Sequence, residues 1–157
     1  MRRAIVFAVV ACALAVPAAR AQTPLSDEAK KAILAYELTL PRANQLITAM
    51  AAMSKYMVSL PDFQDRMAKS MKMTTAERKA GITGDPKTAA ILKDNKLTAD
   101  EYLVGVPALR MAMMVAQGLP PSANVVASPA NVAFAKANLA ELKPKMDAAD
   151  AAMRPKK

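Results

Sequence analysis

The sequence predicts an all-α protein, a single-domain bundle of about five to seven helices after an N-terminal signal peptide. Three observations favour this class. The chain of 157 residues is rich in Ala, Leu, Lys and Met and has only four glycines, which favours helix over strand. Helix-capping residues recur along it, and the apolar residues between them repeat at the helical period. We expect one helical domain at 22–153 and a basic tail at 154–157.

The first 21 residues have the parts of a secretory signal peptide. Arg2 and Arg3 form a basic start, residues 4–16 are apolar, and residues 19–21 (Ala-Arg-Ala) are suited to a signal peptidase. We therefore expect cleavage after Ala21. The apolar run of 13 residues is shorter than the about 20 that cross a bilayer, and no later stretch is apolar enough to do so.

Two other interpretations of this N-terminus stay open. Arg2 and Arg3 also occur in twin-arginine signals, although the residues that follow lack the flanking pattern. Residues 9–12 (Val-Val-Ala-Cys) have the form of a lipoprotein box, in which Cys12 would be acylated. The alanine-rich composition and the lack of a glycosylation sequon favour a bacterial periplasmic or secreted protein.

Cleavage would leave a chain without cysteine or histidine, because Cys12 lies in the signal. This excludes disulfides, thiol nucleophiles, histidine bases and the usual zinc sites, so we expect neither an enzyme nor a cofactor. The whole chain has a net charge of +9, but its lysines are spread out rather than clustered with aromatic residues. This argues against nucleic-acid binding and leaves only weak contact with anionic envelope surfaces.

Caps and proline breaks delimit the first three expected helices. Ser26 caps the first, which runs to about Tyr36, and Thr39 caps the second, which runs to about Ser59. The third spans about 62–72. Apolar residues of the second and third helices repeat at the helical period and predict buried faces. They are Ala43, Leu46, Ile47, Met50, Met53 and Met57 in the second helix, and Phe63, Met67 and Met71 in the third.

The middle of the chain begins with a capping box at 74–77 (Thr-Thr-Ala-Glu). It opens a short helical turn that Gly81 and Gly84 close. The Asp-Pro pair at 85–86 then places an N-cap before a first-turn proline, and starts a helix that runs to about Lys93.

A second capping box at 98–101 opens the most apolar segment of the mature chain, which ends near Gln117. Pro107 lies inside this segment and predicts a kink that Gly105 makes easier. Residues 118–127 form the longest expected loop.

Ser128 caps the last expected helix. Pro144 is expected to kink or shorten it. Its apolar residues lie on one stripe, which contains Val132, Leu139, Leu142 and Met146.

Four of these segments stand in a recognisable order and spacing: the helix start Leu38-Thr39-Leu40, then Asp85-Pro86, Leu97-Thr98-Ala99-Asp100-Glu101-Tyr102 and Asn131-Val132-Ala133-Phe134. Together they resemble a family of small exported bacterial all-helical proteins of unknown function. The resemblance covers most of the mature chain and implies a helical fold and export, with no assigned activity or cofactor. Where the family has a glycine before Leu97, this chain has Asn95 and Lys96, of which asparagine tolerates the left-handed conformation.

Methionine is the one residue type whose clustering suggests a chemistry. Thioethers bind Cu(I) and Ag(I), and a chain without cysteine or histidine has no softer donor. Met67, Met71 and Met73 form the most site-like group because they lie at a helix end. Methionine also fills the interiors of helical bundles, and we expect core packing to account for these residues. We therefore assign no metal site and keep this trio as an alternative.

The remaining polar candidates have structural explanations. Tyr102 is expected to donate a hydrogen bond to the carbonyl of Leu103, which Pro107 leaves free. Acidic pairs at 62 and 65 and at 100–101 stand in first helical turns, where the helix dipole favours them.

The sequence thus predicts a non-enzymatic binding or accessory module whose ligand and partners it does not identify. A small apolar ligand is expected near Gly105 and Pro107 and the loop at 118–127. Two alternatives are a methionine-based Cu(I)/Ag(I) binding protein and a protein that self-associates in the cell envelope through apolar helix faces.

Overall fold

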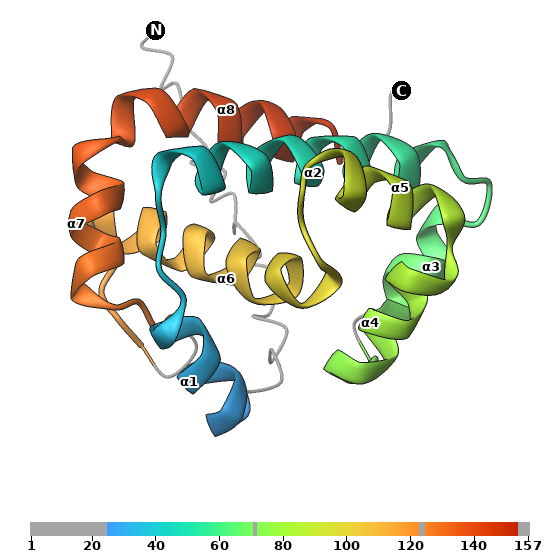
Figure 1. Cartoon of the computed structure of the whole chain (residues 1–157), viewed down its shortest axis with the longest axis horizontal. Helices are drawn as coiled ribbons and strands as arrows, with labels where there is room; N and C mark the ends of the chain where they lie inside the picture. Colours follow the sequence, from blue (N-terminus) through green and yellow to red (C-terminus); the bar gives the residue numbers. More distant parts are fainter. Residues whose placement is uncertain (1–24, 71, 123–124, 154–157) are drawn as a thin grey trace, which may run out of the picture.

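Eight α-helices make up the described part of the chain, which a computed structural model gives as residues 25–70, 72–122 and 125–153. They form a single compact helical domain (Figure 1). The signal peptide expected at 1–21, the tail expected at 154–157 and Met71 lie outside the described residues. The helices are α1 (Asp27–Ala35), α2 (Leu40–Ser59), α3 (Phe63–Ser70), α4 (Thr75–Gly84), α5 (Pro86–Asp94), α6 (Ala99–Ala116), α7 (Pro129–Ala137) and α8 (Leu139–Ala151).

Six helices begin at the cap that the sequence predicts, because each cap side chain accepts a hydrogen bond from an amide of the first turn. The six caps are Ser26, Thr39, Thr74, Asp85, Thr98 and Ser128. The capping boxes are complete at α4 and α6, where Glu77 and Glu101 bond back to the cap residue. The first box opens a helix of ten residues, longer than the expected turn, which continues through Gly81. The helix α6 is continuous through Pro107.

The expected number of helices was too low because the last expected helix is two helices, α7 and α8. The chain breaks at Asn138, and Pro144 lies inside α8. Asn138 donates a side-chain hydrogen bond of 2.8 Å to the carbonyl of Phe134, which caps the end of α7 and leaves the start of α8 without a side-chain cap. In Figure 1, α8 leaves α7 at a steep angle and returns across the molecule beside α2.

A left-handed residue ends α5, but it is Lys96, with a φ of 55°, and not Asn95. The amide of Lys96 donates to the carbonyl of Lys93 at 3.0 Å, and that of Leu97 donates to the carbonyl of Leu92 at 2.9 Å. This pair of bonds is a Schellman motif, which brings the residue after the left-handed one back onto the helix. Leu92 and Leu97 are both buried as a result.

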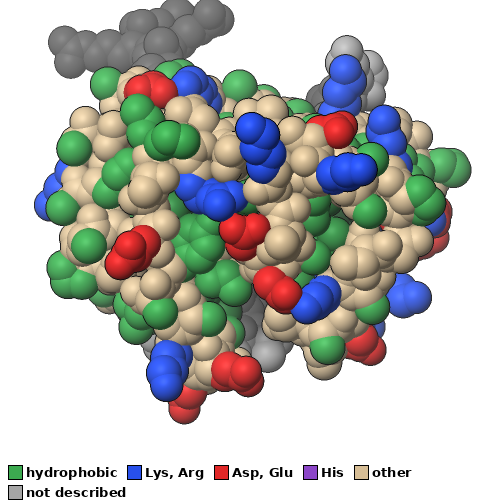
Figure 2. All heavy atoms as spheres, in the orientation of Figure 1, with side chains coloured by type: hydrophobic (Ala, Val, Ile, Leu, Met, Phe, Trp, Pro, Cys, Tyr) green, Lys and Arg blue, Asp and Glu red, His purple; other side chains and the backbone are tan. Residues whose placement is uncertain are grey.

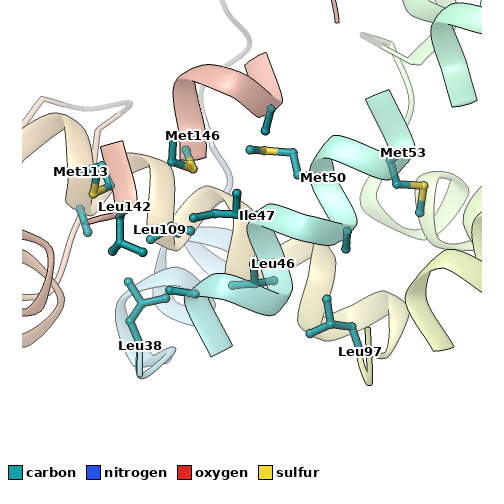
Figure 3. Packing of buried hydrophobic residues seen from close by; sticks show 14 of the residues in the cluster. Leu38, Leu46, Ile47, Met50, Met53, Leu97, Leu109, Met113, Leu142 and Met146 are labelled. Atoms are coloured by element: carbon teal, nitrogen blue, oxygen red, sulfur yellow. The ribbon is translucent and has the colours of Figure 1, made fainter. Parts of the chain in front are cut away.

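The core lies where α2, α6 and α8 meet (Figure 1). Each contributes one of the largest fully buried side chains, Leu46, Leu109 and Leu142 respectively. In Figure 3, Ile47 points toward Leu109, and Met50 and Met146 point toward one another. The buried face predicted for α2 is confirmed for every residue except Met57, which is only half-buried. No helix in the described residues is both long and apolar enough to cross a membrane.

Asn131 is a buried polar residue that joins α7 to the connection between α1 and α2. It is 3% exposed. Its side-chain amide donates to the carbonyl of Tyr36 at 2.7 Å and accepts from the amide of Leu38 at 3.0 Å. Both atoms of one side chain therefore satisfy backbone groups that no helix satisfies.

The surface in Figure 2 carries basic and acidic side chains interspersed with apolar ones. Many charged side chains of the described residues form ion pairs, such as Lys79 with Asp100 at 2.6 Å and Lys143 with Asp147 at 2.6 Å. On this face, therefore, the excess positive charge of the chain is not gathered into one basic surface.

Candidate functional site: a methionine-lined cavity

A cavity of about 740 Å³ lies between α2, α3, α4 and α6. Thr88 of α5 and Met153, which follows α8, complete its wall. This volume falls within the range of roughly 300–1,000 Å³ that is typical of small-molecule sites. The cavity is therefore large enough to hold an organic ligand.

Six methionines line this cavity. They are Met50, Met53 and Met57 of α2, Met67 of α3, Met73 before α4, and Met153. Met50 and Met53 also belong to the buried core, and Figure 3 shows Met53 pointing away from the contact of Met50 with Met146. The other four are only half-buried. Core packing therefore accounts for part of the methionine pattern, and the cavity wall accounts for the rest.

Two members of the proposed metal-binding trio, Met67 and Met73, lie on this one cavity. The third, Met71, lies outside the described residues. Among the described residues, no group of three or more Asp and Glu side chains is arranged to hold a metal ion. Thioether sulfur is the soft donor that this cavity offers in number.

Two hydroxyl groups on the cavity wall have no hydrogen-bond partner among the described residues. Ser54 is only 4% exposed and lines the cavity from α2. Tyr102 lines it from α6, and burial raises the pKa of its phenol to about 12, so the hydroxyl is protonated at neutral pH. The bond expected from Tyr102 to the carbonyl of Leu103 does not form. Both hydroxyls are available to a ligand instead.

The acidic side chains of the wall are mostly engaged. Asp85 accepts hydrogen bonds from the hydroxyl of Tyr56 at 3.0 Å and from the amides of Lys87 and Thr88 at 2.8 and 3.1 Å. Burial alone would raise the pKa of Asp85, but these bonds outweigh it and lower the pKa. Asp62 is paired with Arg66 at 2.8 Å, and this bond holds its pKa below the usual value. Neither carboxylate is placed to act as a free base.

The basic side chains of the wall divide into two kinds. Arg66 pairs with Asp62, and Arg110 pairs with Asp150 of α8 and contacts the sulfur of Met50 at 3.0 Å. Lys69 and Arg78 also line the cavity, but the side chain of neither forms an ion pair or hydrogen bond with another described residue. These two cations remain free for an anionic group.

The cavity is covered by the least buried helices of the described chain. Neither α3 nor α4 contains a buried residue. The helix α3 packs on α2, while α4 packs on α5 and α6. Moving either helix would therefore expose little apolar core.

The cavity lies only partly where the sequence predicts a binding site. Leu103 and Val106, close to Pro107, line it, but no described residue of the loop at 118–127 does. Gly105 faces the other way, toward Tyr36 and Leu46. The apolar stripes of α2 and α3 were visible in the sequence, but their convergence on one space depends on how the helices pack.

Comparison of the chain with protein-family models, curated proteins and solved structures found no match in any of the three. The resemblance to a family of small exported helical proteins therefore stays a prediction.

Proposed function

We propose that this protein is an exported, non-enzymatic binding protein that holds a small, largely apolar molecule in the methionine-lined cavity. The observation that carries the proposal is the cavity itself, in which six thioether side chains surround a space of about 740 Å³. Export to the periplasm or the medium rests on the signal features of residues 1–21.

The chemistry of the wall supports binding better than catalysis. Of the three aspartates on the wall, Asp62 and Asp85 are engaged by hydrogen bonds or an ion pair, and Asp65 is exposed at the surface. The phenol of Tyr102 is held protonated and is therefore a hydrogen-bond donor rather than a base. Together with Ser54, it gives an apolar site two points at which to orient a ligand.

A neutral fluorescent probe, N-phenylnaphthylamine, tests whether the cavity binds apolar molecules. Val106 lines the cavity, so Val106→Phe would fill part of it and is expected to weaken probe binding about tenfold. The control is Val104→Phe, at a half-buried position of α6 that does not line the cavity. Circular dichroism verifies that both variants remain helical. Equal binding by the parent and the Val106 variant would overturn the proposal.

Native mass spectrometry of the protein recovered from its host's cell envelope tests export and occupancy together. A chain beginning at Gln22 would support cleavage after Ala21, and an organic mass increment would support a bound ligand. A chain that retains residues 1–21 would contradict the proposed processing.

A second candidate function is binding of Cu(I) or Ag(I). The observation that favours it is the presence of Met67 and Met73 on the same cavity as four other methionines. Titration with Ag(I) of the Met67→Leu/Met73→Leu double variant is expected to show lost binding with unchanged helicity. The matched control is Met111→Leu/Met114→Leu, on α6 outside the cavity. If the Met67→Leu/Met73→Leu variant bound Ag(I) as tightly as the parent does, this site would be ruled out.

Self-association remains a prediction from the sequence. The large hydrophobic side chains that the described residues leave exposed are Leu34 of α1 and Leu119 after α6.

A further inference from the structure

We infer that the ligand of the cavity is an amphipathic organic anion, whose acid group lies at Lys69 and Arg78 and whose apolar body lies among the methionines. This inference rests on the proposed function and specifies the chemical class of the ligand. It follows from the charges on the wall, the position of the two free cations and the nature of the apolar surface.

Four charged residues of the cavity wall form no ion pair among the described residues, namely the cations Lys69 and Arg78 and the carboxylates Asp65 and Asp85, of which Asp85 is held by hydrogen bonds. Arg66 and Arg110 are neutralised by carboxylates of this chain, whereas Lys69 and Arg78 are not. On the acidic side, only the exposed Asp65 lacks a partner among the described residues. An anionic group would meet two cations whose side chains are in no ion pair or hydrogen bond with a described residue, while a cationic group would face them.

The two free cations come from the two helices that cover the cavity. Lys69 lies near the end of α3, and Arg78 lies in α4. The hydrogen bonds from the amide and the hydroxyl of Thr74 are the main causes that lower the pKa of Glu77, the neighbour of Arg78 in α4. The charge of Lys69 adds a smaller effect in the same direction. The ammonium of Lys69 is therefore near enough to α4 for its charge to act on Glu77, and both Lys69 and Arg78 line the same cavity.

Arginine suits the acid group for a further reason. Its planar guanidinium offers parallel N–H donors that match a carboxylate or a phosphate, and in Arg78 no partner within the described residues occupies them. The two residues are exposed, so the acid group would be held at the rim while the apolar body is buried. This arrangement fits a molecule that is polar at one end only.

The interior of the cavity matches the other end. Methionine side chains, Leu103, Val106 and Ile82 dominate its surface. Thioether chains are unbranched and flexible, so they conform to alkyl or ring systems of different shape. Recognition by this wall depends on apolar contact, and the cations at the rim then select for charge.

Displacement of N-phenylnaphthylamine from the parent protein tests the inference with three competitors of one chain length, decanoate, decyl phosphate and decanol. We expect at least one of the two anions to displace the probe at about tenfold lower concentration than decanol. The anion that competes better distinguishes a carboxylate from a phosphate. If neither anion competes better than the neutral alcohol, the inference is wrong.

The variant pair Lys69→Gln/Arg78→Gln is expected to remove the advantage of the anions while leaving displacement by decanol unchanged. The matched control is Lys31→Gln/Lys136→Gln, which removes the same charge at exposed positions of α1 and α7, two helices that do not line the cavity. If the control variant lost the advantage of the anions over decanol to the same extent, the effect would come from net charge and the inference would be overturned. Failure of the proposed function gives a different result from failure of this inference. In that case the parent would not bind N-phenylnaphthylamine, or the Val106→Phe variant would bind it as tightly as the parent does.

Discussion

The ring of Tyr36 packs against the backbone of Gly105, so closely that no side chain fits between them. A Cβ atom at position 105 would lie 2.8 Å from both Cζ and Oη of Tyr36, and 2.9 Å from Cδ1 of Leu46. The hydroxyl of Tyr36 is itself buried without a hydrogen-bond partner among the described residues. This contact is part of the packing of α1 and its connection to α2 against α6.

Gly105→Ala is therefore expected to destabilise the protein by about 1–3 kcal/mol, although alanine is the better helix former. Urea denaturation measures the change. The control is Gly81→Ala in α4, where a Cβ would meet only Cε of Met73 at 3.9 Å. That variant is expected to be as stable as the parent or about 1 kcal/mol more stable. Equal stability of the Gly105 variant and the parent would contradict the packing described here.

Asn131→Ala is expected to cost about 2–3 kcal/mol, because it leaves the carbonyl of Tyr36 and the amide of Leu38 buried without a partner. Asn131→Asp keeps an acceptor for Leu38 but places a carboxylate against the carbonyl of Tyr36, and is also expected to destabilise. Thermal unfolding of both variants measures the effect. Asn138→Ala, which removes one partly buried bond, is the control and is expected to cost about 1 kcal/mol. If Asn131→Ala lost less stability than Asn138→Ala, the two hydrogen bonds assigned to the Asn131 side chain would be wrong.

Lys96→Gly is expected to stabilise the protein by about 1 kcal/mol, because the left-handed conformation at Lys96 is unfavourable for a residue with a Cβ. The carbonyl that accepts from Arg42 at 3.1 Å belongs to the backbone and is retained. Lys93→Gly, inside α5, is the control and is expected to lose about 1 kcal/mol. Chemical denaturation distinguishes the two, and a loss of stability in both would show that position 96 carries no backbone strain.

The ionisation of Glu101 is expected to make the free energy of unfolding depend on pH in the acid range. The hydrogen bond from the amide of Thr98 is the main cause that lowers the pKa of Glu101 below 4.5, and Arg42 adds to it. A lowered folded-state pKa contributes stability above the unfolded value, and this stability is lost as the pH falls through the folded pKa.

Glu101→Gln retains the capping geometry but not the charge. Its free energy of unfolding should therefore fall less than that of the parent between about pH 6 and pH 3, as measured by urea denaturation. Glu37→Gln is the control, because Glu37 is exposed and has no ion pair among the described residues. If the parent and the Glu101 variant lost stability in parallel, the assignment would be wrong.

Amide hydrogens of α3 and α4 are expected to exchange faster than those of α2 and α6, because the two covering helices contain no buried residue. Hydrogen exchange followed by mass spectrometry measures this. Addition of N-phenylnaphthylamine is expected to slow exchange in α3 and α4 and to leave α7, which does not line the cavity, unchanged. Probe-induced protection of α7 instead would place the binding site elsewhere.

Much of the fold was predictable because helix starts are local. Thr98 and Glu101 lie within one turn, so their capping box can be recognised without knowing what surrounds it. The break at Asn138 was missed because proline is a stronger local signal than asparagine, yet Pro144 is accommodated inside α8. Lys96 was missed because its conformation is imposed by the burial of Leu97, a contact made in three dimensions.

The cavity was less predictable than the helices. The stripe of Met50, Met53 and Met57 indicates a face of α2 but not what that face meets. Only the packing of α3 and α4 beside it shows that some of these side chains surround a space. The sequence did not reveal the free hydroxyl of Tyr102 either. It suggested a partner close by, the carbonyl of Leu103 that Pro107 leaves without an amide donor.

A wall built from thioethers has a consequence for how the site adapts. Each unbranched side chain can change its torsion angles while the helix that carries it stays in place. Complexes with guests of different width should therefore superimpose closely in the backbones of α2 and α6 and differ in the rotamers of Met53, Met57 and Met67. Tolerance of many shapes would then be a property of the side chains alone, achieved without deforming the scaffold.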